Sequence, residues 1–241
     1  MAKQSTIEKY EVKTAILVDG GFYRKRAISL FGLKPPAERA KELNNYCIQH
    51  LHDKYEERCL YRIFYYDCPP SDGNAYHPLT DKTINLRKTP QYDWMVSFLN
   101  ELKHQRKFAL RLGRLSETQA HYDIKYDSLK KLMRRELALD DLTENDFSID
   151  IQQKGVDMKI GVDISSLAFK RQVNQIILIS GDSDFVPAAK QARREGIDFI
   201  LDPMGDPIKP DLFEHIDGIR SHVKHFTPKR DTQLEVSHGK G

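Results

Sequence analysis

Residues 175–201 read QIILISGDSDFVPAAKQARREGIDFIL, and this stretch decides the fold. Its first part, Gln175 to Ser180, is a short apolar run of the kind that forms a buried strand. Phe185 to Glu195 has helical spacing, and a second apolar run, Ile197 to Leu201, begins directly after Gly196. Short connections between a strand, a helix and a strand predict a right-handed crossover between two parallel strands. We therefore expect an α/β fold with a mainly parallel central sheet.

A strand of the same kind lies near the start of the chain. Thr14 to Val18 is apolar and rich in β-formers, and it stops at Asp19-Gly20-Gly21, as a buried strand does at a turn. The remaining periodic segments predict helices at Phe22 to Phe31, Ala37 to Tyr55, Trp94 to Lys103, Lys130 to Leu139 and Val156 to Phe169, and strands at Leu60 to Tyr66, Lys107 to Leu115 and Phe147 to Gln152. Together these elements predict one domain over residues 1–226.

Two segments differ from this pattern. Cys68 to Thr80 (CPPSDGNAYHPLT) is rich in turn-forming residues, and it predicts an exposed loop inserted into the domain over about residues 68–90. Residues 227–241 are polar and have no periodicity, so we expect a flexible tail there.

The charges of the chain are nearly balanced. With 38 Lys and Arg against 35 Asp and Glu, the formal net charge is +3, so binding to nucleic acid has to come from local patches. Three cysteines without a C-x-x-C pair, Cys47, Cys59 and Cys68, argue against a disulfide framework or a zinc finger and favour a cytoplasmic location. No apolar run approaches the roughly 18 residues of a membrane span, and the polar N-terminus does not resemble a signal peptide, so no membrane contact is expected.

Acidic residues follow two of the predicted strands. Asp19 ends the run ILVDGG, and Asp182 and Asp184 follow in ILISGDSDF. Because the carboxyl ends of parallel strands lie at one edge of a sheet, three carboxylates are expected to gather there. Crowded carboxylates repel one another unless they bind a cation or hold protons. Oxygen ligands with water in the remaining positions suit Mg²⁺ or Mn²⁺, so the sequence predicts one of these ions as cofactor.

Each acid also has a plainer interpretation on its own. Asp182 or Ser183 could cap the helix that starts near Phe185. Asp157, in the first turn of its predicted helix, would meet the positive end of the helix dipole. Their occurrence in one β-α-β unit, with Asp19 available at a strand end, favours a shared site.

Three motifs resemble the NYN domains of the PIN-like nuclease superfamily, in particular the bacterial LabA-like group. They are VDGGF at residues 18–22, KGVDMKIGVDI at 154–164 and SGDSDFVPAAKQARREG at 180–196. The resemblance implies a three-layer α/β/α sandwich and metal-dependent ribonuclease activity. It carries the family's catalytic and metal-binding acids onto Asp19, Asp157, Asp182 and Asp184. The chain departs from the usual VDG-x-N motif, because Phe22 stands where the family has Asn.

Four further residues of these motifs are candidates to support the metal ligands or to contact substrate: Asp163, Ser180, Ser183 and Lys154. Asp163 lies six residues after Asp157, which turns it about 120° away around a helix, so both cannot face one ion. It could equally be a buried structural acid, and Lys154 could contact phosphate or be a solvated loop residue. Ser180 and Ser183 have no nearby His with an orienting acid, so a hydrolytic triad is disfavoured.

An acidic site that takes a polyanion needs positive charge around it. The candidates follow the first motif or lie on the alternating strand at 107–115: Arg24, Lys25, Arg26, Lys107, Arg111 and Arg114. Each contact with a phosphate would add salt dependence to binding, although such charge runs are also common on solvated faces. Four tyrosines could stack on unpaired bases or belong to the core: Tyr23, Tyr65, Tyr66 and Tyr76.

These residues lead to one hypothesis and two alternatives. The hypothesis is a nuclease that hydrolyses phosphodiester bonds of single-stranded RNA with a water activated by Mg²⁺ or Mn²⁺. The first alternative is a catalytically weak RNA- or protein-interaction module on the same fold, which Phe22 would allow. The second is a metal-dependent phosphatase, although Asp19 is followed by Gly20-Gly21 and not by the usual D-x-D pair. A homo-oligomer is compatible with each of these three functions.

Overall fold

The computed structural model describes residues 11–54, 56–115, 120–151 and 153–226. Its centre is a six-stranded sheet in the order β12-β11-β10-β1-β2-β5, and every neighbouring pair is parallel. The strands are β1 (Glu11–Asp19), β2 (Glu57–Asp67), β5 (Phe108–Leu112), β10 (Gln175–Ile179), β11 (Asp198–Asp202) and β12 (Gly218–Ile219). The parallel sheet predicted from residues 175–201 is therefore confirmed. The tail expected at residues 227–241 lies outside the described residues.

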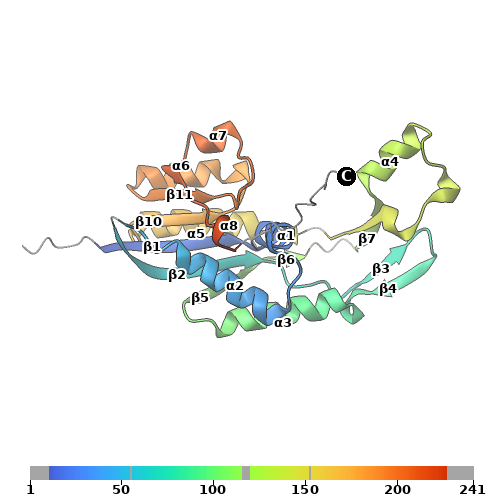
Figure 1. Ribbon diagram of the computed structural model, residues 1–241, viewed down its shortest axis with the longest axis horizontal. Coiled ribbons are helices and arrows are strands. Elements are labelled where there is room, and N and C mark those ends of the chain that lie inside the picture. The colour runs from blue at the N-terminus through green and yellow to red at the C-terminus, as the bar shows by residue number, and fades with distance from the viewer. Residues whose placement is uncertain (1–10, 55, 116–119, 152, 227–241) are drawn as a thin grey trace, which may run out of the picture.

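Helices cover both faces of this sheet (Figure 1). One face carries α1 (Gly20–Phe31), α2 (Pro36–Gln49) and α3 (Pro90–His104), and the other carries α5 (Val156–Phe169) and α6 (Val186–Arg194). Alternate residues of β1 point to opposite faces of the sheet. Ile16 and Val18 pack in the core under α1, α2 and α3, and Ala15 and Leu17 pack in the core under α5 and α6. The three-layer α/β/α sandwich is therefore confirmed.

Two short helices, α7 (Pro210–Phe213) and α8 (Val223–Phe226), follow the sandwich helices along the chain. The helix predicted over Ala37 to Tyr55 is shorter than expected, since α2 ends at Gln49. His50 begins the turn that follows, where its buried ring contacts Asp202 at the end of β11. No helix in the described part of the chain is long and apolar enough to cross a membrane.

Residues 74–86 and 121–150 form an arm that extends beyond the carboxyl ends of the main strands (Figure 1). Its sheet has the order β4-β3-β7-β8, with β3 (Asn74–His77), β4 (Lys82–Asn85), β7 (His121–Ile124) and β8 (Phe147–Asp150), and α4 (Tyr126–Met133) follows β7. A short ladder of β6 (Arg114–Leu115) and β9 (Gln153–Lys154) lies between the arm and the sandwich in sequence. The segment expected as an inserted loop therefore contains two strands.

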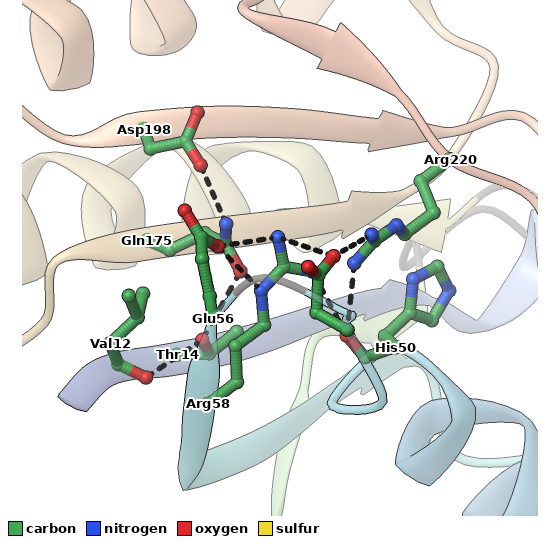
Figure 2. Close-up of polar contacts among 9 residues, drawn as sticks. Val12, Thr14, His50, Glu56, Arg58, Gln175, Asp198 and Arg220 are labelled. Atoms are coloured by element: carbon green, nitrogen blue, oxygen red, sulfur yellow. Dashed lines mark hydrogen bonds and ion pairs between the residues drawn. The ribbon is translucent and has the colours of Figure 1, made fainter. Parts of the chain in front are cut away.

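Polar contacts join the amino ends of the strands at the opposite edge of the sheet (Figure 2). The Thr14 hydroxyl on β1 donates to Gln175 Oε1 on β10 at 3.2 Å, and Gln175 Nε2 donates to Asp198 on β11. Further hydrogen bonds beside them connect Glu56, Arg58, His50 and Arg220. Glu56 and Asp198 at this edge thus accept hydrogen bonds from Arg58 and Gln175.

Candidate metal centre

Asp19 ends β1 and begins α1. Its side chain caps the helix, because Oδ1 accepts a hydrogen bond from the Phe22 N–H at 3.1 Å. Oδ2 accepts from the Ser180 hydroxyl at 3.2 Å, so the end of β10 holds the second oxygen. Burial raises the pKa of Asp19, the two hydrogen bonds lower it, and the charges of Asp157 and Asp67 raise it again. The carboxylate is thus fixed by neutral donors and destabilised by other acids.

The GDSD turn after β10 carries the next two acids. Asp182 Oδ1 accepts from the Asp184 N–H at 3.1 Å and caps the short 3₁₀ helix Ser183–Phe185. The Asp182 N–H itself donates to Ser180 Oγ at 3.3 Å, so Ser180 connects this turn to Asp19. Asp182 is therefore a cap of this short 3₁₀ helix, and α6 after it has no side-chain cap. Both aspartates nevertheless remain exposed at the surface.

Asp157 lies in the first turn of α5. The preceding Gly155 has a φ of 81°, a left-handed conformation that glycine adopts without strain, and the helix starts there. Partial burial and the charges of Asp182 and Asp184 raise the pKa of Asp157. Since Asp157 also raises the pKa of Asp19, it is the carboxylate that links the end of β1 to the GDSD turn.

The four aspartates converge without forming a closed cage. Within the described residues, three side chains with ligand atoms mutually within 4.8 Å occur only at His121, Asp123 and Asp150. Metal–oxygen bonds of about 2.1 Å limit two ligands of one ion to a separation of about 4.2 Å. The acids at the carboxyl edge can therefore share an ion only if side chains move inward or water completes the shell.

The triad of His121, Asp123 and Asp150 is a separate metal candidate on the arm. His121 and Asp123 are two residues apart on β7 and share a face, while Asp150 lies opposite His121 on β8. His121 Nε2 and Asp123 Oδ1 are 3.3 Å apart. Nothing in the spacing of these residues along the chain indicates the triad. Any measurement of metal binding has to separate it from the aspartates of the sandwich.

Arg24 is paired with a buried acid at the end of β2. Its Nε and Nη2 donate to Asp67 at 2.9 and 3.0 Å, and Asp67 also accepts from the Tyr65 hydroxyl at 2.8 Å. Gly20 leaves room for this cluster, because a Cβ there would lie 2.5 Å from Asp67 Oδ2. Arg24 thus balances the charge of Asp67 beside Asp19, and the two bonds fix the plane of its guanidinium.

Asp163 is paired with groups on two strands. It accepts from the Tyr66 hydroxyl on β2 at 2.9 Å and from Arg111 Nε on β5 at 3.0 Å. The Arg111 guanidinium also lies over the Phe64 ring, 5.2 Å from its centroid. Asp163 and Arg111 therefore stabilise the contact of α5 with the sheet, which gives both a structural task.

The other predicted contacts for substrate differ in their surroundings. Arg26 is tied to Asp206 and to a backbone carbonyl, and Lys107 donates to a carbonyl of β2. Four of these five basic residues are exposed: Lys25, Lys107, Arg114 and Lys154. Arg114 and Lys154 are partners across β6 and β9, so these two cations lie side by side just before α5.

Ser183 has a neighbour that the sequence did not point to. Its hydroxyl accepts a hydrogen bond from Lys209 Nζ at 3.0 Å. Lys209 comes directly before α7 and is 26 residues away along the chain, so only the fold places its charge beside the GDSD turn.

Phe22, at the position where the family has Asn, packs against the GDSD turn. A Cβ on Gly181 would lie 2.9 Å from Phe22 Cε2, so the ring occupies the space that a side chain at 181 would need. Phe22 also packs against the core on the α1 face of the sheet. An apolar ring therefore stands beside Asp182 in place of an amide.

The tyrosines divide into core and surface. Tyr23, Tyr65 and Tyr66 are fully buried, so of the two alternatives open for them the structure places these three in the core. Tyr76 is exposed, and its hydroxyl donates to Asp81 at 2.7 Å.

The parallel sheet and the helices on both its faces define an α/β protein with a three-layer sandwich fold. A family model described as NYN domain matches residues 74–207, and the chain belongs to this family, which is part of the PIN-like nuclease superfamily. The match contains Asp157 and the GDSD turn and begins after Asp19. No curated protein sequence matches the chain. The crystal structure of a protein of unknown function from Vibrio parahaemolyticus is similar, with a TM-score of 0.45 and 15% identity over 86% of this chain and 91% of that one.

Proposed function

We propose that the protein is a metal-dependent ribonuclease that hydrolyses phosphodiester bonds of single-stranded RNA. Its metal-binding and catalytic residues in this proposal are Asp19, Asp157, Asp182 and Asp184. Residues 1–226 would form one NYN domain that includes the arm, with Mg²⁺ or Mn²⁺ as cofactor. A cytoplasmic location belongs to the same proposal and agrees with three cysteines that are free thiols.

One observation carries the proposal: acids from three separate segments act on one another. The charge of Asp157 on α5 raises the pKa of Asp19 at the end of β1, and Asp182 and Asp184 raise the pKa of Asp157. The hydrogen bonds that Asp19 accepts come from neutral donors, Phe22 N–H and the Ser180 hydroxyl. Like charges brought together in this way are typical of sites that bind a metal ion.

The donors fit Mg²⁺ or Mn²⁺ better than zinc. All four proposed ligands offer carboxylate oxygens, which are hard ligands, and no Cys or His is among them. The acids do not form a closed cage, and Mg²⁺ usually keeps several waters between itself and the protein. An open set of carboxylates at the surface therefore suits a partly hydrated ion.

The residues around the acids have distinct tasks in this proposal. When bound, the ion would lower the pKa of a water molecule and stabilise charge on the phosphate. Ser180 positions Asp19 through its hydroxyl and Asp182 through the backbone N–H of that residue. Lys209, beside Ser183, contributes a positive charge. This charge would offset the repulsion between a phosphate and the carboxylates of the acidic turn.

A cleavage assay tests the proposal. Purified full-length protein should cleave a fluorescently labelled single-stranded RNA when Mn²⁺ or Mg²⁺ is added and not in EDTA. Asp182→Asn should lower the rate about a hundredfold or more, because a metal ligand and its charge are lost. Asp140→Asn, at an exposed position on the arm, is the matched control and should cleave at the wild-type rate.

Three outcomes would count against the nuclease. Equal cleavage by Asp182→Asn would assign the activity to other residues or to a contaminant. RNA binding without cleavage at any metal concentration would favour the interaction module. Hydrolysis of a small phosphate monoester but not of RNA would favour the phosphatase.

A further inference from the structure

A cavity of about 500 Å³ lies between the arm and α3. Ile84, Tyr122 and Ile149 line it from the arm, and Tyr92 and Met95 line it from α3. Ile149 is 37% exposed, so the cavity opens to solvent at the arm. Its size and its apolar and aromatic walls are those of a site for a small, flat ligand.

A second cavity of about 360 Å³ adjoins the first. The two share Arg24, Gln91 and Met95. Trp94 lines the second cavity, and its ring is fixed by stacking on Phe98, with ring centroids 5.0 Å apart. We refer to the two cavities together as the trough; it follows the first turns of α3 and has Arg24 at its middle.

The trough begins beside the acidic site. Arg24 is bonded to Asp67, whose charge acts on Asp19. Cys68 lines the first cavity, and the charge of Asp157 acts on its thiol. The wall of the trough is therefore within electrostatic reach of two of the proposed metal ligands.

The charges of the trough favour an anionic ligand. Arg24, Lys34 and Arg39 line it, and their ion-pair partners behind the wall are two carboxylates, Asp67 and Glu42, so the cations exceed the acids by one charge. The guanidinium of Arg24 keeps its plane because Asp67 holds two of its nitrogens. Planar cations and aromatic rings are the surfaces on which proteins stack unpaired bases.

We propose that the trough binds unpaired bases of a single-stranded nucleic acid, one on each side of Arg24, while the adjoining phosphate lies at the aspartates. This inference rests on the proposed nuclease function and names the part of the protein that selects its substrate. A duplex is excluded, because its bases are paired and stacked and cannot enter two side-wall cavities.

Binding should be measured without cleavage. The probe is a fluorescein-labelled single-stranded RNA of about 12 nucleotides, compared with single-stranded DNA and duplex RNA of the same sequence. All variants are made in full-length protein that also carries Asp182→Asn, and anisotropy is recorded in EDTA. Both single strands should bind more tightly than the duplex, and a preference between them would show whether the trough favours RNA or DNA.

Two matched pairs of variants locate the bases. Gln91→Glu adds one negative charge between the two cavities, and Gln105→Glu adds the same charge at the other end of α3. Ile149→Asp changes the wall of the first cavity, and Leu139→Asp changes an exposed apolar residue of the arm segment that lines neither cavity. Gln91→Glu should weaken binding of the single strand about threefold and Ile149→Asp about tenfold. The two control variants should change it less than twofold.

Folding is checked by Tm, and Gln91→Glu keeps the test valid if Ile149→Asp fails to fold, because Gln91 is exposed. Equal binding by Gln91→Glu and Gln105→Glu would overturn the proposal, as would duplex binding as tight as that of the single strand. The metal-dependent cleavage assay separates the two proposals. If the wild-type protein cleaves RNA and the trough variants do not weaken binding, only the trough is refuted. If the trough variants weaken binding and the wild-type protein does not cleave, only the nuclease is refuted.

Discussion

The carboxyl ends of β2 and β11 carry Asp67 and Asp202, and both side chains are fully buried. Arg24 donates two hydrogen bonds to Asp67. Asp202 accepts from the Tyr46 hydroxyl at 2.6 Å and from a backbone N–H at 2.7 Å, and His50 Nε2 lies 2.9 Å away. Each of these acids is therefore buried together with the donors that compensate for lost water.

The two strands between them, β1 and β10, end differently. The carboxylates of Asp19 and Asp182 accept hydrogen bonds from neutral donors, and Asp157 adds a further negative charge. Burial and like charges raise the pKa of Asp19 and of Asp157. At the two outer strand ends the buried acids therefore have donors that compensate for their burial, whereas at the two inner strand ends carboxylates of like charge act on one another.

The largest expected effect is on stability at the compensated end of β2. Asp67→Ala leaves the Arg24 guanidinium without its partner, and breaking such a pair costs about 3 kcal/mol of the free energy of unfolding. Asp184→Ala removes the same group from an exposed position in the GDSD turn and should change it by less than about 0.5 kcal/mol. Urea unfolding of both variants measures the difference. Equal losses would mean that the two kinds of strand end are not distinct.

A second prediction concerns two adjacent glycines at the boundary between these environments. A Cβ on Gly20 would lie 2.5 Å from Asp67 Oδ2 and from Tyr65 Cζ, whereas a Cβ on Gly21 would meet only Asp19 Oδ1 at 3.6 Å. Gly20→Ala should cost about 1–3 kcal/mol, because Asp67 and Tyr65 have to shift. Gly21→Ala should stabilise α1 by up to about 1 kcal/mol, because Ala is the better helix former.

Thermal and urea unfolding of the two glycine variants check this prediction. If Gly20→Ala were as stable as Gly21→Ala, the cluster of Asp67 and Tyr65 would have to be more adaptable than its close contacts indicate. Wild-type stability in Gly20→Ala would contradict the close packing of α1 against β2.

The sequence predicts the strand ends better than their partners. Asp19 and Asp182 could be placed at one edge because an apolar run followed by glycine is a local signal of a strand and a turn. Asp67 also follows an apolar run, yet its role depends on Arg24, 43 residues away along the chain. Pairing over that distance has no periodicity and appears only when α1 and β2 are packed together.

The arm shows a second limit. β3 and β4 have four residues each, too few for the alternation of a strand to stand out among Gly, Pro and Asn. β3 pairs with β7 only through Tyr76 and His121, which are far apart in sequence. Short strands stabilised by distant partners therefore resemble a loop in the sequence, and both the triad and the trough depend on them.

The smallest expected effect is at the uncompensated site, and it has the opposite sign. The pKa of Asp157 is raised above its usual 3.8 in the folded protein. Below that value the folded and unfolded chains both hold the proton, so the group has no effect on stability. As the pH rises through the folded-state pKa, the folded chain loses a proton that it binds more tightly than the unfolded chain, and stability falls. Asp157→Asn avoids this loss and should raise Tm by about 1–2 °C at pH 7 in EDTA, with a smaller difference near about pH 4.

Mn²⁺ should reverse this order, because a ligand that binds only the folded state raises its stability in proportion to the logarithm of its concentration. Wild-type protein should gain more in Tm from Mn²⁺ than Asp157→Asn does, since the variant has lost one carboxylate of the site. Both proteins should also carry Asp150→Asn, which removes the triad on the arm as a competing site. If Mn²⁺ raised the Tm of Asp157→Asn as much as that of the protein with Asp157 intact, these acids would not bind the ion together. The contrast between the inner and outer strand ends would then reflect packing alone.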